Sequence, residues 1–401
     1  MDRLNGVLRL AKSRSRFYAR VLPEGDALRL ESPEDLERIP FTEERDLGLG
    51  IEEFLCVPPG DIARIVSLFT SGSTGRPKRV AFTEEDIRAT VRYFSFGMRQ
   101  MTGPGGRVMI CLPGSSEYGV PHLLSLGVRD FGGEPVVYGA ISDDGPAARF
   151  MADFRPDCIV GVPVQVLSLA VRYRREYGEP CLGTALLTTD YAAAGLKRRV
   201  SAALGCRVLN HYGSTEMGYG GALECAPGSG LHVRDADLYF EIVEPRSGAA
   251  LPPGEEGELV FTTLSRGGMP LIRYRTGDCA RFVREPCGCG GESMRISAPW
   301  RLRGSRVQLP GGRLTLQDLD EILFSSERVK DYSASRVMTS PGSAMLNLRV
   351  WSFGELGQCG AAALERRVRP ALPCGADVRV EPAGAGEANP GLLGKRFLSQ
   401  E

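Results

Sequence analysis

The sequence lacks net charge and long hydrophobic runs, and each absence argues against a class of function. Its 401 residues include 49 basic and 49 acidic side chains, so the formal net charge is zero at pH 7. A balanced chain has no electrostatic reason to bind nucleic acid or an anionic membrane, so we expect small-molecule partners. No run of 18 apolar residues occurs, and residues 1–17 lack the apolar region of a signal peptide. We therefore expect a soluble, cytoplasmic protein.

A disulfide framework is not expected either, although the chain has eleven cysteines and only three histidines. In a chain of this kind, scattered cysteines indicate reduced thiols or a metal site. Cys225 precedes His232 by seven residues, and Cys287 and Cys289 flank one glycine. Three thiolates and one imidazole are a common closed ligand set for Zn²⁺, so the pattern predicts a structural zinc site. The alternative is that all four are ordinary reduced or polar side chains.

The spacing of apolar residues predicts an α/β fold. With 42% hydrophobic residues, the chain can bury a large core and form two domains or more. Between residues 107 and 210, short apolar runs alternate with longer stretches of helical spacing. A βαβ series of this kind predicts a mainly parallel sheet with helices on both faces. We expect strands at 107–113, 134–139, 157–161, 185–189 and 207–213, and helices at 146–155, 163–177 and 192–204.

The pattern changes twice after residue 210. Residues 238–263 favour an antiparallel β subdomain. Beyond about residue 303 the order becomes strand, strand, helix, strand. We therefore expect a large N-terminal domain, residues 1–303, with mainly parallel sheets flanked by helices plus the β subdomain. A small α+β domain, residues 304–401, would follow it.

Residues 68–80, LFTSGSTGRPKRV, have the composition of a loop that binds phosphate. Glycines allow a tight turn whose N–H groups face anionic oxygens, hydroxyls add donors, and a lysine adds positive charge. The loop is not a Walker motif, because no Ser or Thr follows Lys78. A flexible surface turn is the alternative. The candidate phosphate-binding residues are Thr70, Ser71, Gly72, Ser73, Thr74, Gly75 and Lys78.

Two further motifs make the loop more specific: NHYGSTEMG at 210–218 and PLIRYRTGD at 270–278. The three segments together resemble the adenylate-forming superfamily of acyl-coenzyme A synthetases, and most closely its phenylacetate-coenzyme A ligase branch. The resemblance extends from SRSRFYARVL at 13–22 to GKR at 394–396. It implies ATP-dependent activation of a carboxylic acid, best guessed as aromatic or arylacetic, to an acyl-adenylate, followed by transfer to coenzyme A.

The resemblance also implies roles for individual residues. Glu216 would help to hold Mg²⁺, and Asp278 would bind the ribose hydroxyls of ATP. Lys395, on a mobile C-terminal domain, would reach the carboxylate and the α-phosphate during adenylation. The alternatives are a surface acid, a turn residue and an ordinary tail lysine. The remaining assignments are Thr215 beside the phosphate, Tyr212 and Gly213 flanking the adenine, Ser214 in the same nucleotide site, and Arg301 or, as we assign it, Arg303 at the ribose.

Some members of this branch carry the same Cys and His pattern, which supports the zinc site. His211 and His122 would lie near the acyl pocket, or pack as ordinary histidines. The family's hinge aspartate is missing from PWRLRGSRVQLPGG at 299–312, and its Gly-Ala-Glu segment is replaced by TTDY at 188–191. These departures leave two alternatives: transfer to a carrier protein or another nucleophile, and a non-catalytic nucleotide-binding regulator. Intact Glu216, Asp278 and Lys395 favour an enzyme. The sequence carries no signal for oligomeric state.

Overall fold

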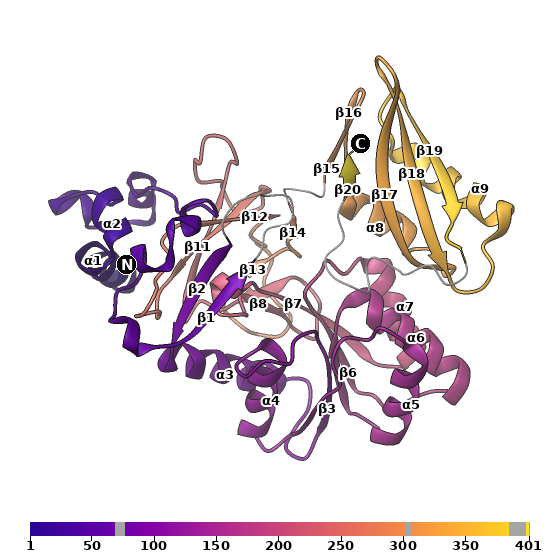
Figure 1. The fold of residues 1–401 in the computed structure, drawn as a ribbon, viewed down its shortest axis with the longest axis horizontal. Coiled ribbons are helices and arrows are strands. Elements are labelled where there is room, and N and C mark those ends of the chain that lie inside the picture. The colour runs from indigo at the N-terminus through magenta and orange to yellow at the C-terminus, as the bar shows by residue number, and fades with distance from the viewer. Residues whose placement is uncertain (69–76, 302–305, 385–397, 401) are drawn as a thin grey trace. The chain divides into compact units, whose positions relative to one another are not determined.

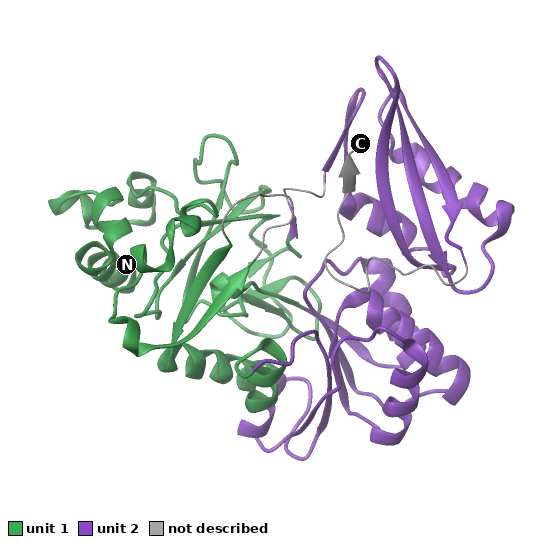
Figure 2. Cartoon of the chain, viewed as in Figure 1, with its two compact units in different colours: residues 1–97, 117–127, 211–299 green, residues 98–116, 128–210, 300–401 purple. Residues whose placement is uncertain are grey.

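The fold was obtained as a computed structural model, which describes residues 1–68, 77–301, 306–384 and 398–400 (Figure 1). The chain forms two compact units, each assembled from segments that are distant in sequence (Figure 2). The first unit contains Met1–Gly97, Glu117–Gly127 and His211–Pro299. The second contains Met98–Ser116, Val128–Asn210 and Trp300–Glu401.

The second unit contains the predicted parallel sheet. Its strands are β3 (Arg107–Cys111), β4 (Glu134–Val137), β5 (Cys158–Gly161), β6 (Thr184–Leu187) and the first four residues of β7 (Arg207–Tyr212), in the order β7-β6-β5-β3-β4. Every residue of β5 and β6 is buried, as expected for a sheet covered on both faces. The connecting helices are α5 (Asp144–Phe154), α6 (Pro163–Tyr177) and α7 (Ala194–Leu204). The predicted α/β fold class is confirmed.

Local sequence explains where these helices begin and end. Asp143 precedes α5, and its side chain accepts a hydrogen bond from the N–H of Gly145. Pro163 opens α6, where the missing N–H of proline costs nothing. Gly178 ends α6 with a backbone φ of +82°, a conformation that residues other than glycine rarely adopt.

The rest of the second unit includes a four-stranded sheet, a two-stranded sheet and helices. It contains β14 (Trp300–Arg301), β15 (Arg306–Leu309), β16 (Gly312–Thr315), α8 (Leu316–Leu323), β17 (Val329–Ser340), β18 (Ser343–Ser352), α9 (Gly357–Val368), η7 (Arg369–Ala371), β19 (Ala376–Pro382) and β20 (Leu398–Gln400). The four-stranded order is β19-β18-β17-β20. The order strand, strand, helix, strand is thus confirmed for β17, β18, α9 and β19. The boundary of a C-terminal domain at residues 304–401 stays a prediction.

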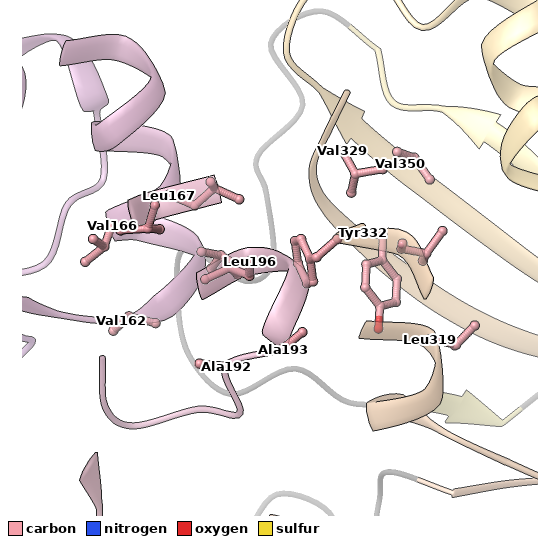
Figure 3. Packing of buried hydrophobic residues seen from close by; sticks show 14 of the residues in the cluster. Val162, Val166, Leu167, Ala192, Ala193, Leu196, Leu319, Val329, Tyr332 and Val350 are labelled. Atoms are coloured by element: carbon pink, nitrogen blue, oxygen red, sulfur yellow. The ribbon is translucent and has the colours of Figure 1, made fainter. Parts of the chain in front are cut away.

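One buried apolar cluster runs through this unit (Figure 3). It includes Leu196 of α7, Leu319 of α8 and Tyr332 of β17. The hydroxyl of Tyr332 donates to Asp320 Oδ1 at 2.6 Å, which satisfies a polar group inside the apolar cluster.

The first unit is built from antiparallel pairs. Strands β1 (Ile62–Leu68) and β2 (Lys78–Thr83) form a hairpin, and β10 (Leu238–Val243), β11 (Gly257–Thr263) and β12 (Tyr274–Ala280) form consecutive pairs. The last two residues of β7 pair with β8 (Ala222–Glu224), which is followed by β9 (Leu231–Val233) and β13 (Arg295–Ile296). The antiparallel subdomain expected at 238–263 is confirmed. Its α-helices are α1 (Asp2–Arg14), α2 (Arg16–Val21), α3 (Glu84–Met98) and α4 (Val120–Asp130), although Met98 and residues 128–130 belong to the second unit. The short helices are η1 (Gly25–Leu28), η2 (Pro33–Arg38), η3 (Asp46–Leu49), η4 (Ile51–Glu53), η5 (Pro59–Asp61) and η6 (Thr215–Met217).

A buried ion pair fixes the N-terminal segment to this antiparallel sheet. Arg273 is 2% exposed and pairs with Glu241 at 2.8 Å. The same guanidinium donates to the carbonyl oxygens of Leu36 and Ile39, each at 2.7 Å. Removing one partner of a buried pair commonly costs about 3–5 kcal/mol, so Arg273 anchors the start of β12.

Among the described residues, no helix is long and apolar enough to cross a membrane. The helices α3 and α6 have 15 residues each, whereas a membrane-spanning helix needs roughly 20 apolar residues.

Candidate active site

Side chains from three motifs meet in the first unit. Lys78 is the first residue of β2, Glu216 lies on η6, and Tyr274 opens β12. Lys78 Nζ lies 2.6 Å from Glu216 Oε1, and the hydroxyl of Tyr274 donates to the same oxygen at 3.3 Å. The structure thus brings the predicted Lys78 and Glu216 into direct contact.

Burial makes this contact strong. Glu216 is 4% exposed. Burial opposes its ionisation, but the positive charge and hydrogen bond of Lys78 outweigh that effect and hold the pKa of Glu216 below its ordinary value. Burial also opposes protonation of Lys78, yet Glu216 and Glu44 raise its pKa. Both groups are therefore charged at neutral pH. Burial and the nearby charge of Glu216 raise the pKa of Tyr274, so its hydroxyl stays neutral and acts as a donor.

Glu44 is a second partner of Lys78 that sequence analysis did not identify. Its Oε1 lies 2.8 Å from Lys78 Nζ. Two carboxylates therefore share one ammonium group. Glu44 lies in the segment PFTEERDL, residues 40–47. The sequence of this segment does not indicate which residue pairs with Glu44, because Lys78 is 34 residues away.

The turn that carries Glu216 depends on glycine. A Cβ atom on Gly213 would lie 2.6 Å from the carbonyl oxygen of Tyr219, which is closer than real contacts allow. The N–H of Tyr219 donates to the carbonyl oxygen of Ser214 at 2.8 Å and closes the turn. Ser214 precedes η6, and Thr215 is its first residue. The motif thus folds into a compact turn between β7 and β8 that fixes Glu216.

Asp278 is presented by an irregularity in β12. The pairing between β11 and β12 shifts between Glu258 and Val260, and Gly277 has φ of +71°. Bulges of this kind redirect a side chain at functional sites. Buried Glu258 holds the bulge, because it accepts hydrogen bonds from the N–H of Gly277 at 3.2 Å and from Arg275 Nε at 2.9 Å.

Tyr212 contacts Asp278 directly. Its hydroxyl donates to Asp278 Oδ2 at 2.8 Å. Burial, together with the charge of Asp278, raises the pKa of Tyr212 well above its ordinary value. Tyr212 is therefore a permanent donor that orients the half-buried carboxylate. The predicted contact of Tyr212 with adenine stays a prediction.

The four predicted zinc ligands also lie together. The ligand atoms of Cys225, His232, Cys287 and Cys289 are all within 4.8 Å of one another. Cys225 Sγ is 3.3 Å from Cys287 Sγ, and Cys289 Sγ is 3.3 Å from His232 Nε2. His232 Nδ1 is 2.7 Å from Ser293 Oγ, which leaves Nε2 directed at the thiols.

The other two histidines differ in environment. His211 lies on β7, and burial, helped by the charge of Arg234, lowers its pKa to about 4. His122 lies on α4, where its Nδ1 accepts a hydrogen bond from the N–H of Tyr118 at 2.9 Å. Their predicted place near an acyl pocket stays a prediction.

Several predicted residues lie outside the part of the chain that the structure describes. Arg301 is described and belongs to β14, but its role at the ribose stays a prediction. The predicted residues outside the described ranges are Thr70, Ser71, Gly72, Ser73, Thr74, Gly75, Arg303 and Lys395.

Residues 21–265 match the sequence model of the family described as AMP-binding enzyme. The chain belongs to this family. The match contains the phosphate-loop motif and the Glu216 turn, and it ends shortly before the RYRTGD motif.

Curated relatives of the chain include phenylacetate-coenzyme A ligases. The chain is 31% identical over 313 residues to that of Thermus thermophilus, covering 74% of this chain and 67% of the relative. It is 32% identical over 260 residues to that of Pseudomonas putida, covering 62% and 58% respectively. The chain thus spans about three fifths to two thirds of these relatives. These matches confirm the resemblance to the phenylacetate-coenzyme A ligase branch.

Solved structures confirm the fold. A 2-hydroxyisobutyryl-CoA ligase in its postadenylation state matches with a TM-score of 0.86 at 21% identity, covering 100% of this chain and 88% of that one. An anthranilate CoA ligase in complex with anthranoyl-AMP matches with a TM-score of 0.61 at 13% identity, covering 82% and 65%.

Proposed function

We propose that the protein activates a carboxylic acid with ATP and then transfers the acyl group to the thiol of coenzyme A. In the first step a carboxylate oxygen bonds to the α-phosphorus of ATP, the bond to the β-phosphate oxygen breaks, and pyrophosphate leaves. In the second step the thiol sulfur attacks the acyl carbon, loses its proton, and AMP leaves. The observation that carries the proposal is the convergence of Lys78, Glu216 and Tyr274 from three motifs.

The charges of the site suit this reaction. Negative charge accumulates on both sides of the transferred phosphoryl group, so fixed positive charge must be in place beforehand. Lys78 supplies such a charge, held in position by Glu216. Glu216 offers a carboxylate oxygen suited to Mg²⁺, which when bound neutralises phosphate charge. Asp278 can accept hydrogen bonds from ribose hydroxyls while Tyr212 orients it.

The names of the relatives support an aromatic or arylacetic acid as substrate. We propose the remaining roles from the motifs: residues 70–75 bind phosphate, Thr215 lies beside it, Ser214 and Gly213 complete the nucleotide site, and Arg303 contacts ribose. Lys395, carried by a C-terminal domain of residues 304–401, would act in adenylation. We also propose that the protein is located in the cytoplasm.

We also propose a structural Zn²⁺ bound by Cys225, His232, Cys287 and Cys289. Three sulfurs and one nitrogen are ligands that Zn²⁺ prefers, and their mutual distances suit one ion. Hydrogen bonds from Ser229 and from the N–H of Cys289 lower the pKa of the Cys287 thiol to about 5, which favours a thiolate ligand. Four protein ligands leave no open position, so the ion would stabilise the fold without taking part in the reaction.

Product analysis tests the proposal. The protein is incubated with phenylacetate, ATP, Mg²⁺ and coenzyme A, and the products are identified by mass spectrometry. We expect AMP and an acyl thioester. An adenylate that accumulates with coenzyme A present would favour a carrier protein or another acceptor. ATP binding without any turnover, over a wide panel of acids, would favour the regulator.

A further inference from the structure

Arg266 contacts the main chain of Glu216 and has no role in the chemistry proposed above. One of its terminal nitrogens, Nη1, donates to the carbonyl oxygen of Glu216 at 2.6 Å. The other, Nη2, donates to the carbonyl oxygen of Ala81 at 3.1 Å. The side chain thus bridges the main chains of two elements.

These elements carry the two charged groups of the site. Ala81 lies in β2, three residues after Lys78, and Glu216 lies in η6. Arg266 therefore links, through carbonyl groups, the strand that positions the ammonium and the turn that positions the carboxylate.

The environment of Arg266 makes this bridge rigid. Arg266 is 7% exposed, and its guanidinium carbon lies 4.5 Å from the ring centre of Phe82. A planar guanidinium held between a ring and two fixed acceptors has little freedom to turn. A buried hydrogen bond to a charged donor is also costly to break.

We propose that Arg266 is a positioning residue for the proposed adenylation. By holding the main chain of Glu216, Arg266 orients the Glu216 carboxylate towards Lys78 and towards the Mg²⁺ that would accompany the nucleotide. This inference rests on the proposed function. A displacement of about 1 Å in a group of this kind can cost about 10²-fold in rate, so the effect should be measurable.

Arg234 provides a matched control. It is 9% exposed, and its guanidinium carbon lies 4.7 Å from the ring centre of Tyr93. It donates to Asp237 and to the carbonyl oxygen of Ala89, and it lines the same small cavity of about 20 Å³ as Arg266. Arg234 has similar burial and chemistry, but its side chain bonds to Asp237 and to the main chain of α3 instead of bridging β2 and η6.

The experiment compares Arg266→Ala, Arg266→Lys and Arg234→Ala in the full chain. We measure acid-dependent pyrophosphate exchange as a function of Mg²⁺, melting temperature, and, without turnover, ATP affinity by calorimetry at low and saturating Mg²⁺. We expect Arg266→Ala to raise the Mg²⁺ concentration for half-maximal exchange about tenfold or more. Arg266→Lys, which keeps the charge but cannot bridge both carbonyls, should shift it in the same direction. Arg234→Ala should change it less than twofold while lowering the melting temperature.

A double variant separates positioning from general destabilisation. In a Glu216→Gln background, Arg266→Ala should lower exchange further by less than twofold, because the group that it positions is already lost. Equal Mg²⁺ shifts in Arg266→Ala and Arg234→Ala, a wild-type Mg²⁺ dependence in Arg266→Lys, or full additivity with Glu216→Gln would overturn the inference. If the wild-type protein shows no exchange with any acid, the proposed function fails. The ATP affinities then test Arg266: Arg266→Ala should weaken ATP binding more at low Mg²⁺ than at saturating Mg²⁺, and an equal effect at both would overturn the inference.

Discussion

The hydroxyl of Tyr212 donates a 2.8 Å hydrogen bond to Asp278 Oδ2. The contact joins the end of β7 to the bulge of β12, two segments that we had recognised as separate motifs. It fixes the position of one carboxylate oxygen of Asp278. The two motifs therefore form one binding element.

The first prediction follows from this contact. Tyr212→Phe should weaken ATP binding about tenfold, because a hydrogen bond to a charged group contributes roughly 1.5–3 kcal/mol. Calorimetry of ATP binding measures the effect, and Tyr177→Phe, at an exposed tyrosine of α6, is the control. An unchanged affinity in Tyr212→Phe would show that Asp278 does not depend on this contact.

The second prediction concerns the buried pair of Lys78 and Glu216. Lys78→Met should lower the free energy of unfolding by about 3 kcal/mol, because Glu216 would remain buried without its cation. The double variant Lys78→Met/Glu216→Gln should be more stable than Lys78→Met alone. Both are measured by denaturant unfolding at neutral pH. A Lys78→Met protein as stable as the wild type would contradict the strength that we assign to the pair.

The third prediction concerns Glu44, which shares Lys78 with Glu216. Glu44→Gln should strengthen ATP binding several-fold, because it frees Lys78 for phosphate and removes a like charge from the site. Glu43→Gln, one residue earlier in the same segment, is the control. Weaker ATP binding in Glu44→Gln would indicate that Glu44 supports the nucleotide instead of competing with it.

The fourth prediction is a pH dependence caused by His211. Its pKa is about 4 in the folded chain, and an ordinary histidine in the unfolded chain has a pKa of about 6.5. The unfolded state therefore binds the extra proton first, and stability is lost as the pH falls from about 6.5 towards 4. The loss reaches roughly 3 kcal/mol when complete.

Denaturant unfolding at several pH values between 7.5 and 4 measures this loss. Replacing His211 by Gln should remove most of the slope in that window, whereas His122→Gln should leave it in place. A His211 ring that titrates near its ordinary pKa in an NMR experiment would refute the assignment.

The periodic parts of the fold could be predicted from the sequence. Strands β3, β5 and β6 are short apolar runs between segments of helical spacing, and burial on both faces of a parallel sheet produces that pattern. The sequence also predicted the turn that carries Glu216 and the cluster of Cys and His residues, because tight turns require glycine and metal sites require particular ligand types at short spacing.

The supporting residues could not be predicted, for physical reasons. Arg266 acts on main-chain carbonyls, which every residue possesses, so its target leaves no mark in the sequence. Glu258 holds a bulge that appears only when β11 and β12 pair. Glu44 finds Lys78 through tertiary folding alone. Each of these contacts depends on distance in space and not on spacing along the chain.

The fifth prediction is the metal. Protein purified without chelator should contain about one zinc per chain. Cys289→Ser should reduce both zinc content and melting temperature, because a structural site contributes binding energy to folding. Cys359→Ser, at an exposed cysteine outside the cluster, should change neither. A zinc-free protein with the wild-type melting temperature would remove the metal from the account.

Acid-dependent exchange of pyrophosphate into ATP, measured with a panel of carboxylic acids and without coenzyme A, is the sharpest test of the proposed adenylation. We expect exchange with at least one aromatic or arylacetic acid, and a loss of about 10²-fold in Glu216→Gln, because the step loses a group that organises its charge. Exchange that ignores the substitution at Glu216, or no exchange with any acid by a folded protein that binds ATP, would contradict it.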